Sequence, residues 1–110
     1  MYQMNERELY GTIIEKPGSE LEYELQLNYY LNKEPVSSDS LNPIRYGITI
    51  EKAAVFSSGS VKKEEKTINN IFYRRDDAEK FLKILIRGKV TPVTFAEIAE
   101  EYVSGLIVCQ

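Results

Sequence analysis

Histidine is missing from this 110-residue sequence, and cysteine occurs once, at Cys109. Histidine is the commonest general base and the commonest metal ligand, so its absence removes most catalytic and metal-binding arrangements. A single cysteine cannot form an internal disulfide, and without histidine it cannot complete a zinc site within one chain. We therefore expect no cofactor and no metal, and we do not expect an enzyme.

Long apolar runs and glycine-rich phosphate loops are also absent. The segment "SSGSVKK" at residues 57–63 lacks the second glycine and the Gly-Lys-Ser/Thr ending of a phosphate loop. No apolar run approaches the roughly 20 residues that span a bilayer. The first residues, "MYQMNERELYG", have neither a basic leader nor an apolar signal core. Together with the lone cysteine, these absences predict a cytoplasmic protein that does not contact a membrane.

The composition is that of a folded globular chain, with 43% hydrophobic and 28% charged residues. Its length predicts a single domain over residues 1–110, with residues 1–7 mobile at the start. The net charge of −3 is small, but residues 35–75 are mildly basic, with seven Lys or Arg against four Asp or Glu.

Residues 21–31 alternate between apolar and polar side chains, which predicts a strand with one face in the core. The preceding "ELYGTIIEK", residues 8–16, is rich in β-branched and aromatic residues, and "PGSE" suits a turn, so a hairpin is expected. The apolar set of the second strand is Leu21, Tyr23, Leu25, Leu27, Tyr29 and Leu31.

A second hairpin is predicted from residues 44–56 and 61–73, joined by "SSGS". Its first strand alternates with Ile48 and Ile50 on one face, and its second strand begins with lysines that suit an exposed edge. Residues 32–43 between the hairpins are loaded with Ser, Pro, Asn and Asp, and we expect a long loop there.

Helical spacing replaces the alternation after residue 74. Ala78, Phe81, Leu82 and Leu85 predict a helix that ends at Gly88. A second helix begins either with a Thr91 cap and Pro92 in first position, or with a capping box of Thr94 and Glu97. Gly105 is expected to end it, leaving residues 105–110 as an apolar tail. The apolar stripe of this helix is Phe95, Ile98, Ala99, Tyr102 and Val103.

Strands grouped before helices indicate an α+β fold. We expect an antiparallel sheet of about four strands, in two hairpins, packed on one face by the two C-terminal helices. The face beneath the helices would be formed by Leu21, Tyr23, Leu25, Leu27, Ile48 and Ile50.

Two adjacent helices raise the possibility of a DNA-reading helix-turn-helix, but the charge argues against it. The second helix would expose Glu97, Glu100 and Glu101, and it contains no Lys or Arg to neutralise phosphates. The basic segment 62–75 has Tyr73 beside its bases, although acids are interspersed among them, so a solvated charged edge is the expected role. Nucleic acid is therefore not the expected partner.

Spare aromatic and apolar side chains favour an interaction surface instead. Tyr30 interrupts an otherwise polar strand face, Tyr10 could lie near it across the first hairpin, and tyrosine is enriched at interfaces. The apolar tail must usually be covered, so it could form a fifth strand, fill a groove beside the helices or pair with a second copy. Burial within the protomer is the first expectation, and a homodimer contact is the next. The candidate surface residues are Tyr10, Tyr30, Leu106, Ile107 and Val108.

Three short motifs carry a resemblance to a known family. They are "YGI" at residues 46–48, "KVTP" at 89–92 and "EEY" at the end of the acidic helix. This arrangement resembles a family of small bacterial proteins of unknown function from Gram-positive anaerobes, over roughly residues 44–103. The resemblance implies a small freestanding cytoplasmic domain, and it supplies no activity, cofactor or site residue.

Our first hypothesis is a non-catalytic protein-interaction or regulatory domain that binds a protein partner or itself, for instance as a homodimer. The alternative is a small-ligand or nucleic-acid-binding module that uses the 32–43 loop or the basic 62–75 segment.

Overall fold

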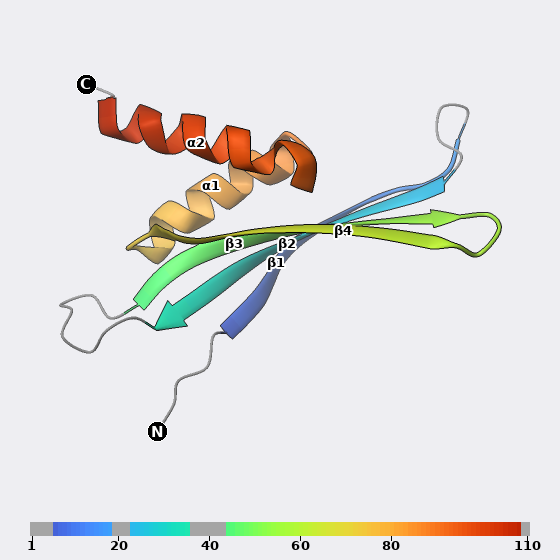
Figure 1. Ribbon diagram of the computed structural model, residues 1–110, viewed down its shortest axis with the longest axis horizontal. Coiled ribbons are helices and arrows are strands. Elements are labelled where there is room, and N and C mark those ends of the chain that lie inside the picture. The colour runs from blue at the N-terminus through green and yellow to red at the C-terminus, as the bar shows by residue number, and fades with distance from the viewer. Residues whose placement is uncertain (1–5, 19–22, 36–43, 109–110) are drawn as a thin grey trace.

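The computed structural model describes residues 6–18, 23–35 and 44–108, except for the side chains of residues 106–108. It confirms the α+β fold, with a four-stranded antiparallel sheet in the order β1-β2-β3-β4 followed by two helices (Figure 1). The elements are β1 (Glu6–Glu15), β2 (Tyr23–Pro35), β3 (Ile44–Phe56), β4 (Val61–Phe72), α1 (Arg75–Arg87) and α2 (Pro92–Val108).

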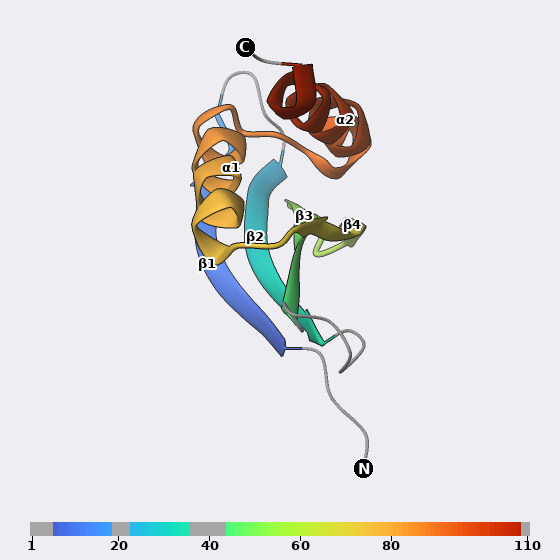
Figure 2. The ribbon, with the colours of Figure 1, turned by 90° about the vertical axis from the view of Figure 1, so that its left-hand side faces the viewer.

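Both helices lie on the same side of the sheet, as the alternation predicts (Figures 1 and 2). In the paired strands, Tyr29 lies opposite Ile50. Leu31 likewise lies opposite Ile48. Strand side chains on this side and the apolar stripes of the helices therefore form one core. Its buried members are Leu27, Tyr29, Leu31, Ile48, Ile50, Phe72, Ala78, Phe81, Leu82, Leu85, Val90, Phe95 and Ala99.

Helix α1 begins and ends where the sequence predicts. Asp76 and Asp77 occupy its first turn, where carboxylates favour the helix dipole, and Gly88 follows its last residue. Gly88 itself keeps a right-handed conformation, and the positive φ of 52° falls on Lys89. The chain then turns inward, and the Tyr29 hydroxyl donates a buried hydrogen bond of 2.8 Å to the Val90 carbonyl.

Helix α2 begins at Pro92, which confirms this proline in the first helical position, and the alternative start at Thr94 is wrong. The expectation that Gly105 ends the helix is also wrong, because α2 continues through Val108. Glycine costs only about 1 kcal/mol relative to alanine within a helix and keeps its N–H donor, so it weakens a helix without ending it.

Strand β2 corrects the predicted 32–43 loop. Residues 32–35 belong to the strand and pair with residues 44–47 of β3, so their backbone groups are satisfied within the sheet. The rest of that loop, residues 36–43, lies outside the described residues. Glu6 and Arg7, predicted to be mobile, belong to β1, and residues 1–5 lie outside the described part. Among the described residues, no helix is long and apolar enough to cross a membrane.

Candidate functional site

One end of the sheet extends past the helices that cover the other end (Figure 1). We call this end the sheet arm and define it as residues 23–26 of β2 and residues 52–66 of β3, β4 and the turn between them. The six residues from Val61 to Lys66 are all exposed. The arm therefore presents sheet surface that the helices leave open.

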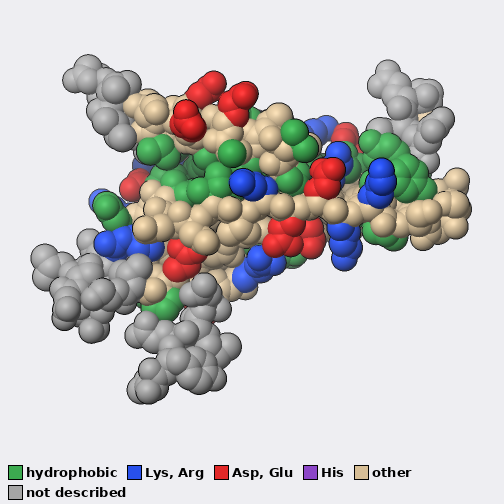
Figure 3. Space-filling model, viewed as in Figure 1, with side chains coloured by type: hydrophobic (Ala, Val, Ile, Leu, Met, Phe, Trp, Pro, Cys, Tyr) green, Lys and Arg blue, Asp and Glu red, His purple; other side chains and the backbone are tan. Residues whose placement is uncertain are grey.

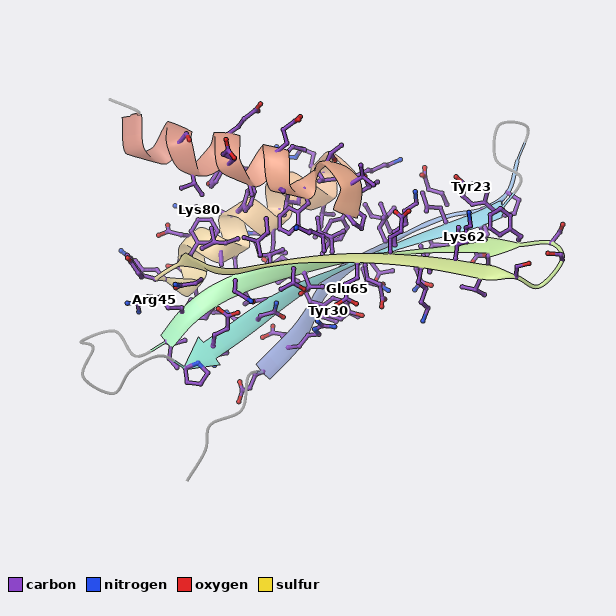
Figure 4. The ribbon with its side chains drawn as sticks, viewed as in Figure 1. Tyr23, Tyr30, Arg45, Lys62, Glu65 and Lys80 are labelled. Carbon is purple, nitrogen blue, oxygen red and sulfur yellow. The ribbon has the colours of Figure 1, made fainter. Side chains whose placement is uncertain are left out.

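The side of the arm that continues the helix-covered face contains a hollow of about 220 Å³. Tyr23 and Phe56 are opposite each other in the β2–β3 register, and their ring centroids lie 5.1 Å apart. Ala54 is buried beside them. Figure 4 shows Tyr23 and Lys62 at this end, beyond the helices. The hollow is lined by Tyr23, Lys52, Ala54, Phe56, Lys62 and Glu64.

This side of the arm is basic, whereas the outward face of α2 is acidic. Among the arm residues of β3 and β4, Lys52, Lys62 and Lys66 share this side with the carboxylate of Glu64, by the pairing of the two strands. Helix α2 contains no Lys or Arg, and the space-filling view shows acidic side chains along its outer side (Figure 3). The exposed acids of α2 are Glu97, Glu100 and Glu101. Val93, at the start of the same helix, is 76% exposed.

Tyr30 lies on the face of the sheet opposite the helices, where Figure 4 shows it near Glu65. The Arg7 guanidinium lies 4.8 Å from the centre of the Tyr30 ring and donates to Glu65 at 3.4 Å. Burial, followed by the nearby Glu51 carboxylate, raises the pKa of Tyr30. Tyr30 is therefore a half-buried part of a polar network on this face.

Tyr10 does not lie beside Tyr30, so that expectation is wrong. The register of β1 against β2 shifts between Leu9 and Gly11, and Tyr10 occupies this bulge. Its ring packs against the core on the helix side, and its hydroxyl lies 3.4 Å from the Glu79 carboxylate of α1. Burial and then Glu79 raise the pKa of Tyr10. A bulge cannot be read from alternation alone, because it adds one residue and reverses the parity.

The remaining candidate surface residues are in the last turn of α2. Leu106, Ile107 and Val108 are helical by their backbone, but their side chains lie outside the described residues. Cys109 lies outside them as well. The predicted surface is therefore divided among the two sheet faces and the end of α2.

The basic segment 62–75 is also divided. Lys62 and Lys66 lie on the arm, whereas Arg75 begins α1 and donates to Glu79 at 2.6 Å and to Glu8 at 2.8 Å. The hydrogen bond from Arg75 lowers the pKa of Glu8. Tyr73 packs against Arg45, whose guanidinium lies 4.2 Å from the ring centre. The bases of this segment therefore do not form one continuous patch.

A second hollow, of about 260 Å³, opens on the face opposite the helices at the end of the sheet away from the arm. We call it the polar pocket. It contains side chains from three strands, including two carboxylates and one guanidinium. Among the described residues, no group of three or more His, Cys, Asp or Glu could hold a metal ion. The pocket is lined by Glu6, Arg7, Asn32, Glu34, Thr67 and Asn69.

Comparison with known proteins shows the family of this chain. Residues 10–105 match the model of a family described as a family of unknown function, DUF6514. The chain belongs to the DUF6514 family. The DUF6514 match begins within β1, so the family includes the first hairpin, which the sequence resemblance had left out. No curated protein and no solved structure matches the sequence.

Both hollows were missed by the sequence reasoning, although a signal was present for each. Ala54 and Phe56 have the same parity as Ile48 and Ile50, which places them on the helix side. The polar alternation that contains Tyr30 also continues through Asn32 and Glu34, into residues for which the composition predicts a loop. What the alternation could not reveal is where the helices stop covering the sheet.

Proposed function

We propose that this member of the DUF6514 family is a non-catalytic interaction module whose sheet arm binds an acidic helix face, namely α2 of a second copy. The observation on which the proposal rests is that one chain has two surfaces of opposite charge. A basic, aromatic-floored hollow lies on the arm, and an acidic outward face with an exposed valine lies on α2.

The chemistry of the two surfaces is complementary. Val93 supplies an aliphatic side chain that would otherwise remain in water, and the rings of Tyr23 and Phe56 offer it an apolar floor. The carboxylates of α2 and the lysines around the hollow attract each other and would fix the orientation of the contact. A partner that lacks either the acids or the apolar residue would lose one of the two contributions.

The contact cannot be made within one molecule, because α2 packs its Phe95 and Ala99 into the core and turns its acids away from the sheet. Two copies related by a two-fold axis would place each arm on the partner's α2. Such an interface is isologous and closed, so it favours a dimer over open chains.

A protein surface fits the arm better than a nucleic acid does. Aromatic rings and lysines together could bind a single strand by stacking and charge. In the arm, however, Tyr23 and Phe56 pack on each other, and Glu64 stands among the lysines directly opposite Lys52. A carboxylate in that position repels the phosphates of a nucleic acid, and two rings that pack on each other leave less of their faces free to stack on bases.

Sedimentation equilibrium of the full chain over a wide concentration range tests the proposal. We expect a monomer–dimer equilibrium at low salt that weakens as salt is added. The double variant Lys52→Glu/Lys62→Glu should weaken the dimer by about tenfold or more, because it reverses the charge of the arm. The matched control Lys80→Glu/Lys83→Glu makes the same charge change on exposed positions of α1 and should leave the dimer unchanged.

Reversing the charges of both surfaces, each in a different chain, tests whether α2 is the segment that binds the arm. The triple variant Glu97→Lys/Glu100→Lys/Glu101→Lys should not self-associate, but it should form a heterodimer with the arm double variant. A chain that stays monomeric at every concentration, or a dimer that the arm variant leaves intact, would overturn the proposal. If a monomer instead bound an oligothymidine of about 12 nucleotides, and the arm variant abolished that binding, the nucleic-acid alternative would replace it.

A further inference from the structure

Beyond self-association, the polar pocket has the groups of a ligand site, and its deepest group is Asn32. This residue is only 7% exposed, and its Nδ2 donates a 2.9 Å hydrogen bond to the Thr49 hydroxyl. Its Oδ1 is buried with no hydrogen-bond partner among the described residues. Buried polar atoms in native proteins are nearly always paired, and an unpaired acceptor lowers stability. Asn32 lines the polar pocket, where a small rotation of its side chain would bring this covered acceptor to a hydrogen-bond donor.

Glu34 adds a carboxylate to the same wall. It is 8% exposed, and its Oε1 accepts a 2.9 Å hydrogen bond from the Asn70 backbone N–H. A carboxylate held largely away from water attracts cations strongly. The pocket therefore offers an ammonium group two acceptors, Oδ1 of Asn32 and the Glu34 carboxylate.

The backbone around Glu34 is shaped to hold it there. Gly47 lies opposite Asn32, and a Cβ at this position would come within 3.2 Å of Oε2 of Glu34 and 2.7 Å of the Ile68 carbonyl. The pairing of β3 with β4 also shifts at this point, and Asn70 adopts a φ of 60° to present its N–H. The glycine of the "YGI" motif thus allows the close approach of the β4 backbone and, beside it, of the Glu34 carboxylate.

Arg7 supplies the opposite charge at the edge of the pocket. Its guanidinium is oriented by the Tyr30 ring and by contacts with Glu65 and Thr49, both made through Nη2. A guanidinium has five N–H donors in a planar fork, so the Nη1 and Nε donors remain for a carboxylate. Glu6 also lines the pocket, but its carboxylate lies 3.7 Å from Lys33 and is partly neutralised.

We propose that the polar pocket binds a small zwitterion of the α-amino acid type. Its ammonium donates to Oδ1 of Asn32 and to Glu34, and its carboxylate accepts from Arg7. The size agrees, because about 260 Å³ is below the roughly 300–1,000 Å³ of sites for drug-sized ligands. An anion without an amine would meet the Glu34 carboxylate, and a cation without a carboxylate would leave Arg7 unused.

Two-dimensional NMR of the full, ¹⁵N-labelled chain tests the inference. The first probe is an equimolar mixture of the twenty common amino acids, followed by each amino acid alone. We expect saturable shifts of the Asn32 side-chain amide and the Asn70 backbone amide, the two signals nearest the acceptors. The tightest amino acid is then compared with its carboxamide, which keeps only the ammonium, and with its N-acetyl derivative, which keeps only the carboxylate. Each derivative should bind at least about tenfold more weakly than the zwitterion.

Variants test separately the residue that would bind the carboxylate of the ligand and the residue that would bind its ammonium group. Arg7→Gln should weaken the amino acid by about tenfold and leave the carboxamide unchanged, whereas Glu34→Gln should weaken both. Arg87→Gln, at an exposed position at the end of α1, is the control and should change neither. Because Glu34 is buried, Glu34→Gln could disturb the fold. Its binding result is used only if the other backbone amide signals keep their positions. If they do not, the test rests on Arg7→Gln. No shift at Asn32 and Asn70 with any amino acid, or equal binding of zwitterion and carboxamide, would overturn the inference.

Discussion

The helix-covered half of the sheet and the sheet arm share strands β2, β3 and β4 with the same alternation, but their surroundings differ. In the covered half, Tyr29 and Ile50 are fully buried beneath the helices. In the arm, the corresponding pair of Tyr23 and Phe56 is only half-buried. An alternating strand therefore determines which side chains share a face, and the length of the covering helices determines which of them leave water.

Strand β4 shows the same difference in burial between its two ends. Its first six residues, Val61 to Lys66, are exposed, whereas Phe72 at its other end is buried against Phe81 with ring centroids 5.9 Å apart. A strand that is charged at one end and apolar at the other suits a sheet of which only one half is covered by helices. It also leaves an edge whose lysines discourage unspecific pairing with other strands.

The largest expected difference between the two halves comes from truncating one aromatic ring in each. Phe81→Ala removes a fully buried ring and should lower the free energy of unfolding by about 3–5 kcal/mol. Phe56→Ala removes a half-exposed ring and should cost about 1 kcal/mol, because less apolar area is lost. Urea unfolding followed by circular dichroism measures both. Equal costs would mean that the arm is as well covered in solution as the rest of the sheet.

A smaller effect should distinguish the core tyrosine by its pH dependence. Burial raises the pKa of Tyr29 to about 12, above the value of about 10 in an unfolded chain. Its contribution to stability is therefore complete below about pH 10 and declines by about 1.4 kcal/mol per pH unit between the two values. Tyr29→Phe should cost about 1–2 kcal/mol at neutral pH, because the Val90 carbonyl loses its donor.

The same variant should also show a shallower loss of stability between pH 10 and about 12, measured by urea unfolding at each pH. Parallel curves for the two proteins would show that the Tyr29 hydroxyl titrates as if it were in water. In that case the covered half would be more open than its burial indicates.

The smallest effect is expected at the exposed margin of the covered half, where Arg75 joins α1 to β1. Because the Arg75 hydrogen bond lowers the pKa of Glu8, this carboxylate stabilises the fold above its ordinary pKa of 4.5 and loses that contribution as the pH falls. Arg75→Ala should return the pKa of Glu8 toward 4.5, with little change in unfolding at neutral pH, since exposed ion pairs contribute little. NMR titration of the Glu8 carboxyl carbon measures the shift. An unchanged pKa would mean that the contact is not populated in solution.

Much of the fold could be predicted from the residues themselves. The alternation of β2 and β3, the apolar stripe of α1 and the Thr91-Pro92 start of α2 are local patterns with direct physical causes. The errors have causes that lie elsewhere in the chain. Residues 32–35 look like a loop because they are polar, yet they are held in β2 by pairing with β3. Tyr10 lies on the helix side of the sheet, and not on the side of Tyr30, because the pairing of β1 with β2 contains a bulge at this residue.

The candidate sites depended even more on the tertiary structure. The polar pocket requires Asn32 and Glu34 of β2 to meet Arg7 of β1, and the arm requires α1 and α2 to leave part of the sheet uncovered. Neither condition can be predicted from the sequence of a single segment. The residue types could be identified, but not that residues from different strands and helices lie close together.

By itself, the sequence determined the class of the fold, the faces of its central strands and the residues of its core, because periodicity and helix-start chemistry act over a few neighbouring positions. Only the tertiary structure decided which apolar side chains are covered, which polar side chains are buried, and where opposite charges meet. Those properties depend on registers, bulges and helix placement, which join residues that are far apart along the chain.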